Sequence, residues 1–222
     1  RDYISIAEVR FKLQAAIAPN ASSAAYFMYL GNASATNPPS NRENIYEYFE
    51  DFSSDVFGAG TWTTSTNPAY CTTAFSVVSN RLQKGNYTPG DCFAWDDNVT
   101  FTAGEDWYVE SDLELTSGIR PVVGSLSLHD DAGTGGYWTG LTENATDSVF
   151  IRNSAGTFTP SAGATVSLGT TYRVTWLYDY TTPLSRTHTV WMNGTQVLQS
   201  NDANANFTLG TGKFGVHNYN PF

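Results

Sequence analysis

Short apolar runs recur along most of this chain, and clusters of Gly, Ser, Thr, Asn and Pro separate them. Each run has the length of a β-strand, and strands at such regular spacing are typical of a two-sheet sandwich or jelly roll. Aromatic residues, which strands favour, make up 14% of the chain, and helix formers are scarce. The sequence therefore predicts an all-β, antiparallel jelly-roll sandwich. Its strand-like runs are Phe75–Val78, Trp107–Leu115, Val122–His129, Tyr137–Leu141, Val149–Arg152, Tyr172–Tyr178, His188–Met192, Gln196–Gln199 and Lys213–Val216.

One turn between these runs has a specific signature. Met192-Asn193-Gly194-Thr195 places Asn-Gly between two strand-like runs. Asn and Gly readily adopt the positive φ angles of a type I′ turn, so we expect a tight β-hairpin at this point.

Two further strand-like runs lie near the start of the chain. Residues 8–17 alternate between polar and apolar side chains, which is typical of a half-buried strand. Residues 24–30 are apolar on both faces, so they predict a strand sandwiched between two layers. The apolar side of the first run consists of Val9, Phe11, Leu13, Ala15 and Ile17.

A short helix is expected after these strands. Ser40-Asn41-Arg42-Glu43 has the spacing of a capping box, and apolar residues follow it at helical intervals. We therefore predict one helix over residues 41–50. The chain then divides into an N-terminal β extension with this helix, residues 1–50, and a jelly roll over residues 51–222.

Asn-x-Ser/Thr sequons are unusually frequent, and each marks a surface asparagine that can carry a glycan in a secreted protein. They predict an extracellular or cell-surface glycoprotein. In that setting the two cysteines, Cys71 and Cys92, are expected to form a disulfide, which would stabilise the fold by about 3 kcal/mol. Buried thiols are the alternative. The sequons lie at Asn20, Asn32, Asn86, Asn98, Asn144, Asn193 and Asn206.

The charge of the chain argues against two classes of partner. Its formal net charge is −10 and it contains no cluster of Lys and Arg, so neither nucleic acid nor an anionic membrane is expected to bind it. The sequence also contains no apolar run long enough to span a bilayer. It opens without a leader-like segment, which is expected of a mature or trimmed form.

Two stretches near the N-terminus resemble a known secreted architecture. Tyr26–Asn32 and Asn44–Phe52 resemble the closing strand and exit helix of a small β domain of unknown function, which precedes a concanavalin A-like (laminin-G-like) jelly roll in secreted archaeal and bacterial proteins. Residues 53–222 resemble that jelly roll. Most strands of the preceding domain are absent, which leaves residues 4–30 without their expected partners. The matching pieces of the jelly roll are Trp107–Glu110, Tyr137–Leu141, Tyr172–Trp176, Trp191–Gly194 and Gly212–Val216.

Glu110-Ser111-Asp112-Leu113-Glu114 matches the E-x-D-x-E signature of glycoside hydrolase family 16, which has the same fold. The resemblance would make Glu110 the nucleophile and Glu114 the acid/base, with Asp112 between them. A retaining mechanism requires the two carboxylates about 5–5.5 Å apart. The alternative is an amphipathic strand with its acids in solvent. The position of the match along the chain favours that alternative. In the hydrolases the signature follows the broad strand that ends the substrate cleft, whereas here it falls on an earlier strand, ahead of residues 118–129.

Other polar and aromatic residues suggest binding sites. His129-Asp130-Asp131 precedes a Gly-rich stretch that can form a calcium-binding loop, with a flexible hairpin loop as the alternative. Asp96-Asp97 is a weaker candidate for Ca²⁺. The three histidines, His129, His188 and His217, lie far apart in the sequence and have no zinc-type or triad spacing, so structural roles are expected.

The aromatic pair Tyr137-Trp138 can stack on sugar rings, together with Trp95, Trp176 and Trp191. Large aromatic residues in a sandwich are more often core residues, and both interpretations remain open at this point.

Three functions follow, in order of preference. The first is a non-enzymatic subunit of an extracellular filament or surface assembly, which polymerises with identical subunits when a strand from residues 1–30 completes a neighbour's sheet. No cofactor other than a structural Ca²⁺ is implied. The second is a lectin-like module that binds surface carbohydrate, and the third is a glycoside hydrolase. In the filament hypothesis the subunit interface consists of Val9, Phe11, Leu13 and Ile17.

Overall fold

The computed structural model describes residues 48–64, 75–84, 90–102, 104–116, 122–130, 136–143, 148–157, 159–204 and 211–220. The chain separates into two units, Arg1–Asp51 and Phe52–Phe222. Only residues 48–51 of the first unit are described, so the account below concerns the second. The predicted strands over 8–17 and 24–30 lie outside the described residues. The predicted helix over 41–50 also lies outside them except at residues 48–50, which are not helical.

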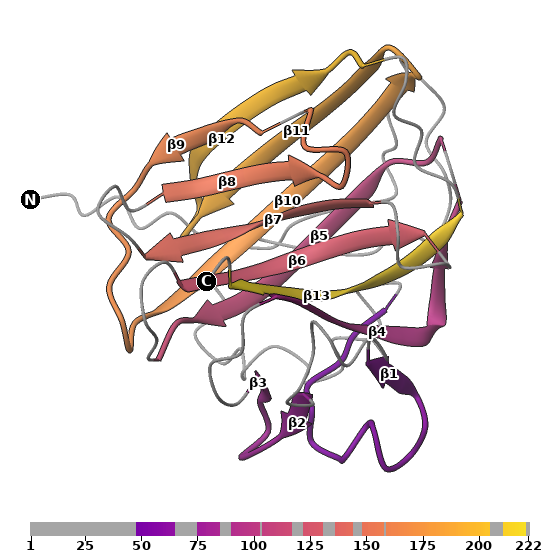
Figure 1. Cartoon of the computed structure of the whole chain (residues 1–222), viewed down its shortest axis with the longest axis vertical. Coiled ribbons are helices and arrows are strands. Elements are labelled where there is room, and N and C mark those ends of the chain that lie inside the picture. Colours follow the sequence, from indigo (N-terminus) through magenta and orange to yellow (C-terminus); the bar gives the residue numbers. More distant parts are fainter. Residues whose placement is uncertain are drawn as a thin grey trace, which may run out of the picture. The chain divides into compact units, whose positions relative to one another are not determined.

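The second unit is an antiparallel β-sandwich, and no helix occurs among its described residues (Figure 1). A large sheet of seven strands has the order β1-β4-β13-β6-β7-β8-β9, and a small sheet of four strands has the order β12-β11-β10-β5. Strands β2 and β3 form a separate hairpin. The strands are β1 (Trp62–Thr64), β2 (Phe75–Val77), β3 (Leu82–Lys84), β4 (Gly90–Phe101), β5 (Trp107–Glu114), β6 (Val122–Asp130), β7 (Gly136–Glu143), β8 (Ser148–Asn153), β9 (Ser161–Gly163), β10 (Thr171–Thr182), β11 (Ser185–Met192), β12 (Thr195–Asp202) and β13 (Gly212–Asn220).

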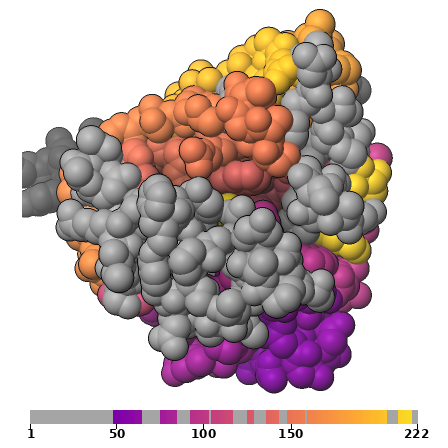
Figure 2. Space-filling view, viewed as in Figure 1, coloured from indigo at the N-terminus to yellow at the C-terminus, as the bar shows by residue number. Residues whose placement is uncertain are grey.

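This architecture confirms the predicted jelly roll. The edges of the large sheet lie at opposite ends of the surface in Figure 2, with β1 in indigo and β8 and β9 in orange. None of the described residues belongs to a helix long and apolar enough to cross a membrane.

The main core lies between the two sheets and follows from strand alternation. Leu126 and Leu128 of β6, in the large sheet, are fully buried. They belong to one apolar cluster with Val174 and Trp176 of β10, in the small sheet. Burial of each such side chain stabilises the fold by about 1.5–3 kcal/mol. This cluster joins the sheets into one body.

A second core lies beneath β1 and β4. Val56, Trp62, Phe75, Cys92 and Ala94 are buried there together. Cys92 is 1% exposed, whereas Cys71 lies outside the described residues, so the disulfide between them remains a prediction.

The approach of β13 to β4 depends on a glycine. A Cβ atom added at Gly215 would lie 2.2 Å from the carbonyl oxygen of Ala94, which is too close for any side chain. The register between these strands also shifts between Lys213 and Gly215, as at a β-bulge. A glycine is therefore required at this point of the sheet.

The predicted Asn-Gly hairpin is present between β11 and β12. Asn193 and Gly194 have φ angles of 50° and 79°, as a type I′ turn requires. The Asn193 side-chain oxygen also accepts a hydrogen bond of 2.9 Å from the backbone N–H of Arg173, which ties the turn to β10.

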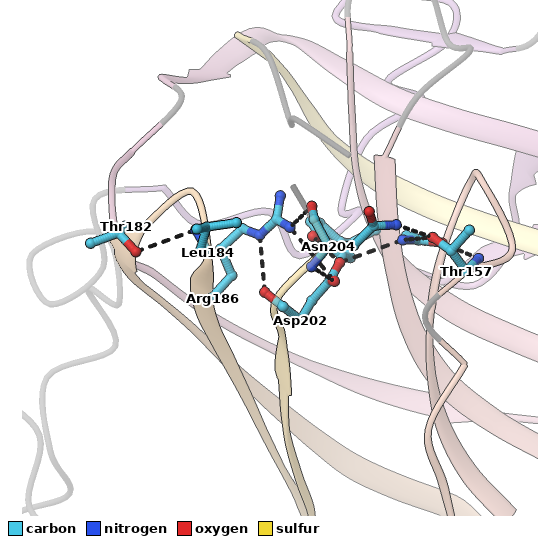
Figure 3. A network of polar contacts seen from close by, with 8 residues as sticks. Thr157, Thr182, Leu184, Arg186, Asp202 and Asn204 are labelled. Carbon is cyan, nitrogen blue, oxygen red and sulfur yellow. Dashed lines mark hydrogen bonds and ion pairs between the residues drawn. The ribbon is translucent and has the colours of Figure 1, made fainter. Parts of the chain in front are cut away.

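A buried polar network links the two sheets (Figure 3). Arg186 of β11 and Asp202 of β12 are each 2% exposed at the side chain, with 3.6 Å between Nη2 and Oδ1. The other oxygen of Asp202 accepts a 2.6 Å hydrogen bond from the Tyr137 hydroxyl of β7 in the large sheet. Arg186 Nη2 also donates to the carbonyl of Asn204 at 2.6 Å. Burial and this bond to Asp202 raise the pKa of Tyr137, so its hydroxyl stays protonated and keeps donating.

His188 lies beside this network as a neutral side chain. Its Nδ1 atom accepts a 3.3 Å hydrogen bond from Trp176 Nε1, which can only donate. The pKa of His188 is lowered to about 3, mainly by burial; the Asp202 carboxylate opposes this shift and the Arg186 guanidinium adds to it. The histidine is thus a core residue, as expected from the sequence.

Candidate functional site

The outer face of the small sheet brings polar and aromatic side chains together. On β5, Val109 is buried in the core, so alternation directs the residues on either side of it away from the core. On β10, Val174, Trp176 and Tyr178 are buried in the same way. The residues on the outer face are Tyr108, Glu110, Asp112 and Glu114 on β5, Thr171, Arg173, Thr175, Leu177 and Asp179 on β10, and Thr189 and Trp191 on β11.

One row of this face crosses all four strands of the small sheet. Glu110 pairs in register with Thr175, Thr175 pairs with Trp191, and Trp191 pairs with Gln196 of β12. Paired residues on one face lie about 5 Å apart, so these side chains are contiguous. The row therefore sets an indole next to a hydroxyl, a carboxylate and an amide.

A second aromatic side chain lies one row away on the edge strand β5. Tyr108 is 49% exposed, and its hydroxyl donates a hydrogen bond of 3.3 Å to Glu110 Oε2. Thr175 Oγ1 donates to the same carboxylate oxygen at 3.1 Å. Glu110 is thus oriented by two hydroxyl groups.

Ion pairs hold the remaining carboxylates of β5. Arg173 donates to both oxygens of Asp112, from Nε at 3.0 Å and from Nη2 at 3.2 Å. Glu114 Oε2 accepts hydrogen bonds from the Thr171 hydroxyl at 2.9 Å and from Arg81 Nη1 at 2.6 Å. The Thr171 bond, followed by the Arg81 bond, lowers the pKa of Glu114. It is therefore a carboxylate at neutral pH.

The hydrolase signature is present, but its carboxylates are spaced along one strand. Glu110 and Glu114 are four positions apart, which corresponds to about 13 Å of backbone at the rise of a strand. This backbone spacing belongs to the signature itself, so the side chains decide what the strand offers. Glu110 accepts a hydrogen bond from Thr175, and Glu114 accepts hydrogen bonds from Thr171 and Arg81. The strand therefore presents hydrogen-bonded acceptors along this face.

The structure separates the predicted aromatic pair. Tyr137 is fully buried in the core with its hydroxyl on Asp202, so it is not exposed to a ligand. Trp138 lies on the other side of β7, on the outer face of the large sheet, where it meets His217 edge-on at 4.8 Å between ring centroids. Phe93 stacks on the same histidine at 4.3 Å.

That second aromatic cluster is largely buried. His217 is 1% exposed, and its neighbour Ser125, whose hydroxyl donates to the His217 carbonyl at 2.9 Å, is 2% exposed. Of the remaining predicted aromatics, Trp176 is 1% exposed in the core and Trp95 donates to Asp97 at 3.1 Å. The outer face of the small sheet is therefore the better candidate for a ligand.

The predicted calcium loop falls largely outside the described residues. The backbone of Asp130 ends strand β6, and Asp131 lies outside the described residues. Asp96 and Asp97 belong to strand β4 instead of a loop. Within the described ranges, no group of three or more His, Cys, Asp or Glu side chains could hold a metal ion.

Two predicted sequons are described, and both are exposed: Asn98 on β4 and Asn193 in the hairpin turn. The other sequons, at Asn20, Asn32, Asn86, Asn144 and Asn206, lie outside the described residues, as do the predicted interface residues Val9, Phe11, Leu13 and Ile17.

Sequence reasoning missed four members of the candidate site, namely Tyr108, Arg173, Thr175 and Gln196. Alternation along β10 could have indicated that Arg173 and Thr175 share a face. Their pairing with Asp112 and Glu110 depends on the register of β10 against β5, which the sequence does not reveal.

No protein-family model and no curated protein matches the sequence. Among solved structures, the carbohydrate-binding module CBM66 from Bacillus subtilis matches with a TM-score of 0.53 and 16% identity, covering 71% of this chain and 86% of that one. A sialidase matches with a TM-score of 0.50 and 15% identity, covering 77% of this chain but 14% of that one. Basic winged bean lectin matches with a TM-score of 0.49 and 10% identity, covering 72% of this chain and 82% of the lectin. The first two likenesses show the fold, which is a concanavalin A-like jelly roll.

Proposed function

We propose that this chain is a carbohydrate-binding, lectin-like module of an extracellular or cell-surface protein, and that it binds sugar on the outer face of its small sheet. The observation that carries this proposal is the row from Glu110 through Thr175 and Trp191 to Gln196. A sugar ring has an apolar face that stacks on an indole and a rim of hydroxyl groups that hydrogen-bond to carboxylates, hydroxyls and amides. The row offers both kinds of group side by side.

Tyr108 extends this surface toward an oligosaccharide. It lies two strands from Trp191, about 10 Å across the sheet, and two residues along the strand direction, about 7 Å, so the two backbone positions are roughly 12 Å apart. That separation suits two different rings of one chain better than one monosaccharide. We therefore expect oligosaccharides to bind more tightly than their monomers.

Two other considerations support a binding module. The fold is shared with a carbohydrate-binding module, although at 16% identity this likeness concerns the fold alone. The sequons fit an extracellular surface that carries glycans. The strand-donation hypothesis depends on residues 1–30, which lie outside the described residues. In the hydrolase hypothesis Glu110 and Glu114 would act on the sugar, whereas in the described structure both accept hydrogen bonds from neighbouring side chains.

The test is a glycan array followed by calorimetric titration of any oligosaccharide that binds. We expect Trp191→Ala to weaken binding roughly fivefold, since stacking on an aromatic ring contributes on the order of 1 kcal/mol. Trp138→Ala is the matched control, because it removes the same side chain from the outer face of the large sheet. Loss of binding in Trp138→Ala but not in Trp191→Ala would show that sugar binds the outer face of the large sheet and that the proposed location is wrong.

Metal dependence is measured in the same titrations. We expect binding to persist after treatment with a chelator, because the groups proposed to contact sugar are side chains of the sheet. Binding that requires Ca²⁺ would instead point to the predicted loop at Asp130 and Asp131.

A further inference from the structure

The outer face of the small sheet has an excess of negative charge. Its carboxylates are Glu110, Asp112 and Glu114 on β5 and Asp179 on β10, whereas Arg173 and the neighbouring Arg81 are the cations that contact them. Four carboxylates and two guanidinium groups give a net charge of −2 (2 − 4) for this part of the described surface. The whole chain carries a formal charge of −10, so the surrounding field has the same sign.

Both guanidinium groups already bond to carboxylates of the face. Arg173 makes two hydrogen bonds to Asp112 and has Nη1 at 3.7 Å from Glu110 Oε1. Arg81 Nη1 lies 2.6 Å from Glu114 Oε2. Because each guanidinium lies beside a carboxylate, an anionic sugar at either arginine would also meet the negative charge of that carboxylate, which opposes its binding.

The same carboxylates suit hydroxyl groups well. A carboxylate accepts hydrogen bonds only, and a sugar hydroxyl can donate one. Asp112 is 53% exposed at the side chain, so a ligand can approach its oxygens from solvent while Arg173 holds the group in place. The exposed side chains of Gln196 and Gln199 add neutral amides that both donate and accept.

We infer that this face selects neutral, hydroxyl-rich glycans and that the β5 carboxylates exclude sugars that carry a carboxylate or sulfate. The inference rests on the proposed function and narrows it to one ligand class. Asp112 and Glu114 act as specificity determinants through repulsion, and the Trp191 row supplies the attraction.

The experiment uses an array on which each oligosaccharide is present twice, as the neutral chain and as the chain oxidised to a carboxylate at C6. The two members of such a pair share ring stereochemistry and length and differ only at C6, where a neutral hydroxymethyl group becomes a carboxylate. For wild-type protein we expect binding to neutral members and at least about tenfold weaker binding to their oxidised partners. Titrations in low and high salt should agree for the neutral ligand, because screening affects only charged ligands.

A charge variant tests the mechanism of exclusion. Asp112→Asn removes one repelling charge and leaves the Arg173 guanidinium with only the more distant carboxylate of Glu110, at 3.7 Å, so binding of the oxidised oligosaccharide should rise at least about fivefold. Asp55→Asn is the matched control. It changes the net charge of the chain equally, but Asp55 bonds to the backbone of Phe57, outside the small sheet.

Three results would overturn this inference, and they can be told apart. If wild-type protein binds oxidised oligosaccharides as tightly as neutral ones or more tightly, the exclusion of anions is wrong and the proposed function stands. If it binds no glycan of either kind, the proposed function fails and the inference fails with it. An equal gain in Asp112→Asn and Asp55→Asn would show that the net charge of the chain, and not this face, excludes anions.

Discussion

The Arg186–Asp202 pair offers a quantitative test of what holds the two sheets together. We consider Arg186→Met and Asp202→Asn, alone and combined. Met keeps much of the arginine's apolar volume without its charge, and Asn keeps one acceptor oxygen for the Tyr137 hydroxyl. Each single substitution therefore leaves one buried charge without its opposite charge.

The expected magnitude follows from the geometry. At the 3.6 Å between Arg186 Nη2 and Asp202 Oδ1, two unit charges attract by about 5 kcal/mol at an effective dielectric constant of 20. The cost of removing both charges from water offsets much of this attraction. Removal of one partner typically costs about 3–5 kcal/mol, because the remaining charge stays buried. We therefore expect Arg186→Met to lower the free energy of unfolding by about 3–5 kcal/mol and Asp202→Asn by somewhat less, since Arg186 keeps its bond to the carbonyl of Asn204.

The double variant should lose less than the sum of the single losses, by about 1–3 kcal/mol, because it leaves no unpaired charge. The assay is equilibrium unfolding in urea, followed by circular dichroism and tryptophan fluorescence, for the wild type and all three variants. Strictly additive losses, or single losses below about 1 kcal/mol, would refute the argument. If Arg186→Met does not fold, the difference between Asp202→Asn and the double variant still tests the coupling.

Three further predictions concern other parts of the fold. His188 has a pKa of about 3 in the folded protein, whereas a histidine in an unfolded chain has its ordinary pKa of about 6.5. The unfolded chain therefore binds the extra proton, and wild-type stability should fall as the pH drops from about 6.5 toward 3, by up to about 1.4 kcal/mol per pH unit. His188→Gln should flatten this slope in urea unfolding at several pH values, and an unchanged slope would contradict the assignment. Gly215→Ala should lower the thermal midpoint and cost about 3 kcal/mol, because the added Cβ meets the backbone oxygen of Ala94 at 2.2 Å; a variant as stable as the wild type would mean that β13 can shift. Reduction of the predicted Cys71–Cys92 disulfide should lower the free energy of unfolding by about 3 kcal/mol, whereas equal stability with and without reductant would count against the pairing.

Most strands of the jelly roll could be predicted, because their apolar periodicity is local. The expected runs over Trp107–Leu115 and Val122–His129 differ from β5 and β6 by one residue at an end, and the Asn-Gly turn has the predicted φ angles. Strand β4 was harder to predict, because the turn-type residues Asp96 to Asn98 interrupt its pattern. Its long pairing with β13 overrides that local preference.

The candidate site was only partly predictable. The alternation of β5 indicates that its three acids share a face, but their partners come from β10, roughly sixty residues later in the chain. Tyr137 and Trp138 illustrate the same limit. Neighbouring residues in a strand point to opposite faces of the sheet, so one of the two must face the core. Only the packing of the two sheets shows that Tyr137, and not Trp138, is the residue buried there.

The sequence by itself therefore determined the fold class, the positions of most strands and the hairpin, since strand periodicity and turn chemistry depend on residues close together in the chain. The tertiary structure decided which residues meet. The order and register of β5, β10, β11 and β12 set Glu110, Thr175, Trp191 and Gln196 in one row, and the packing of the sheets buried Arg186 against Asp202. Both outcomes depend on pairings between distant segments, and local preferences do not encode such pairings.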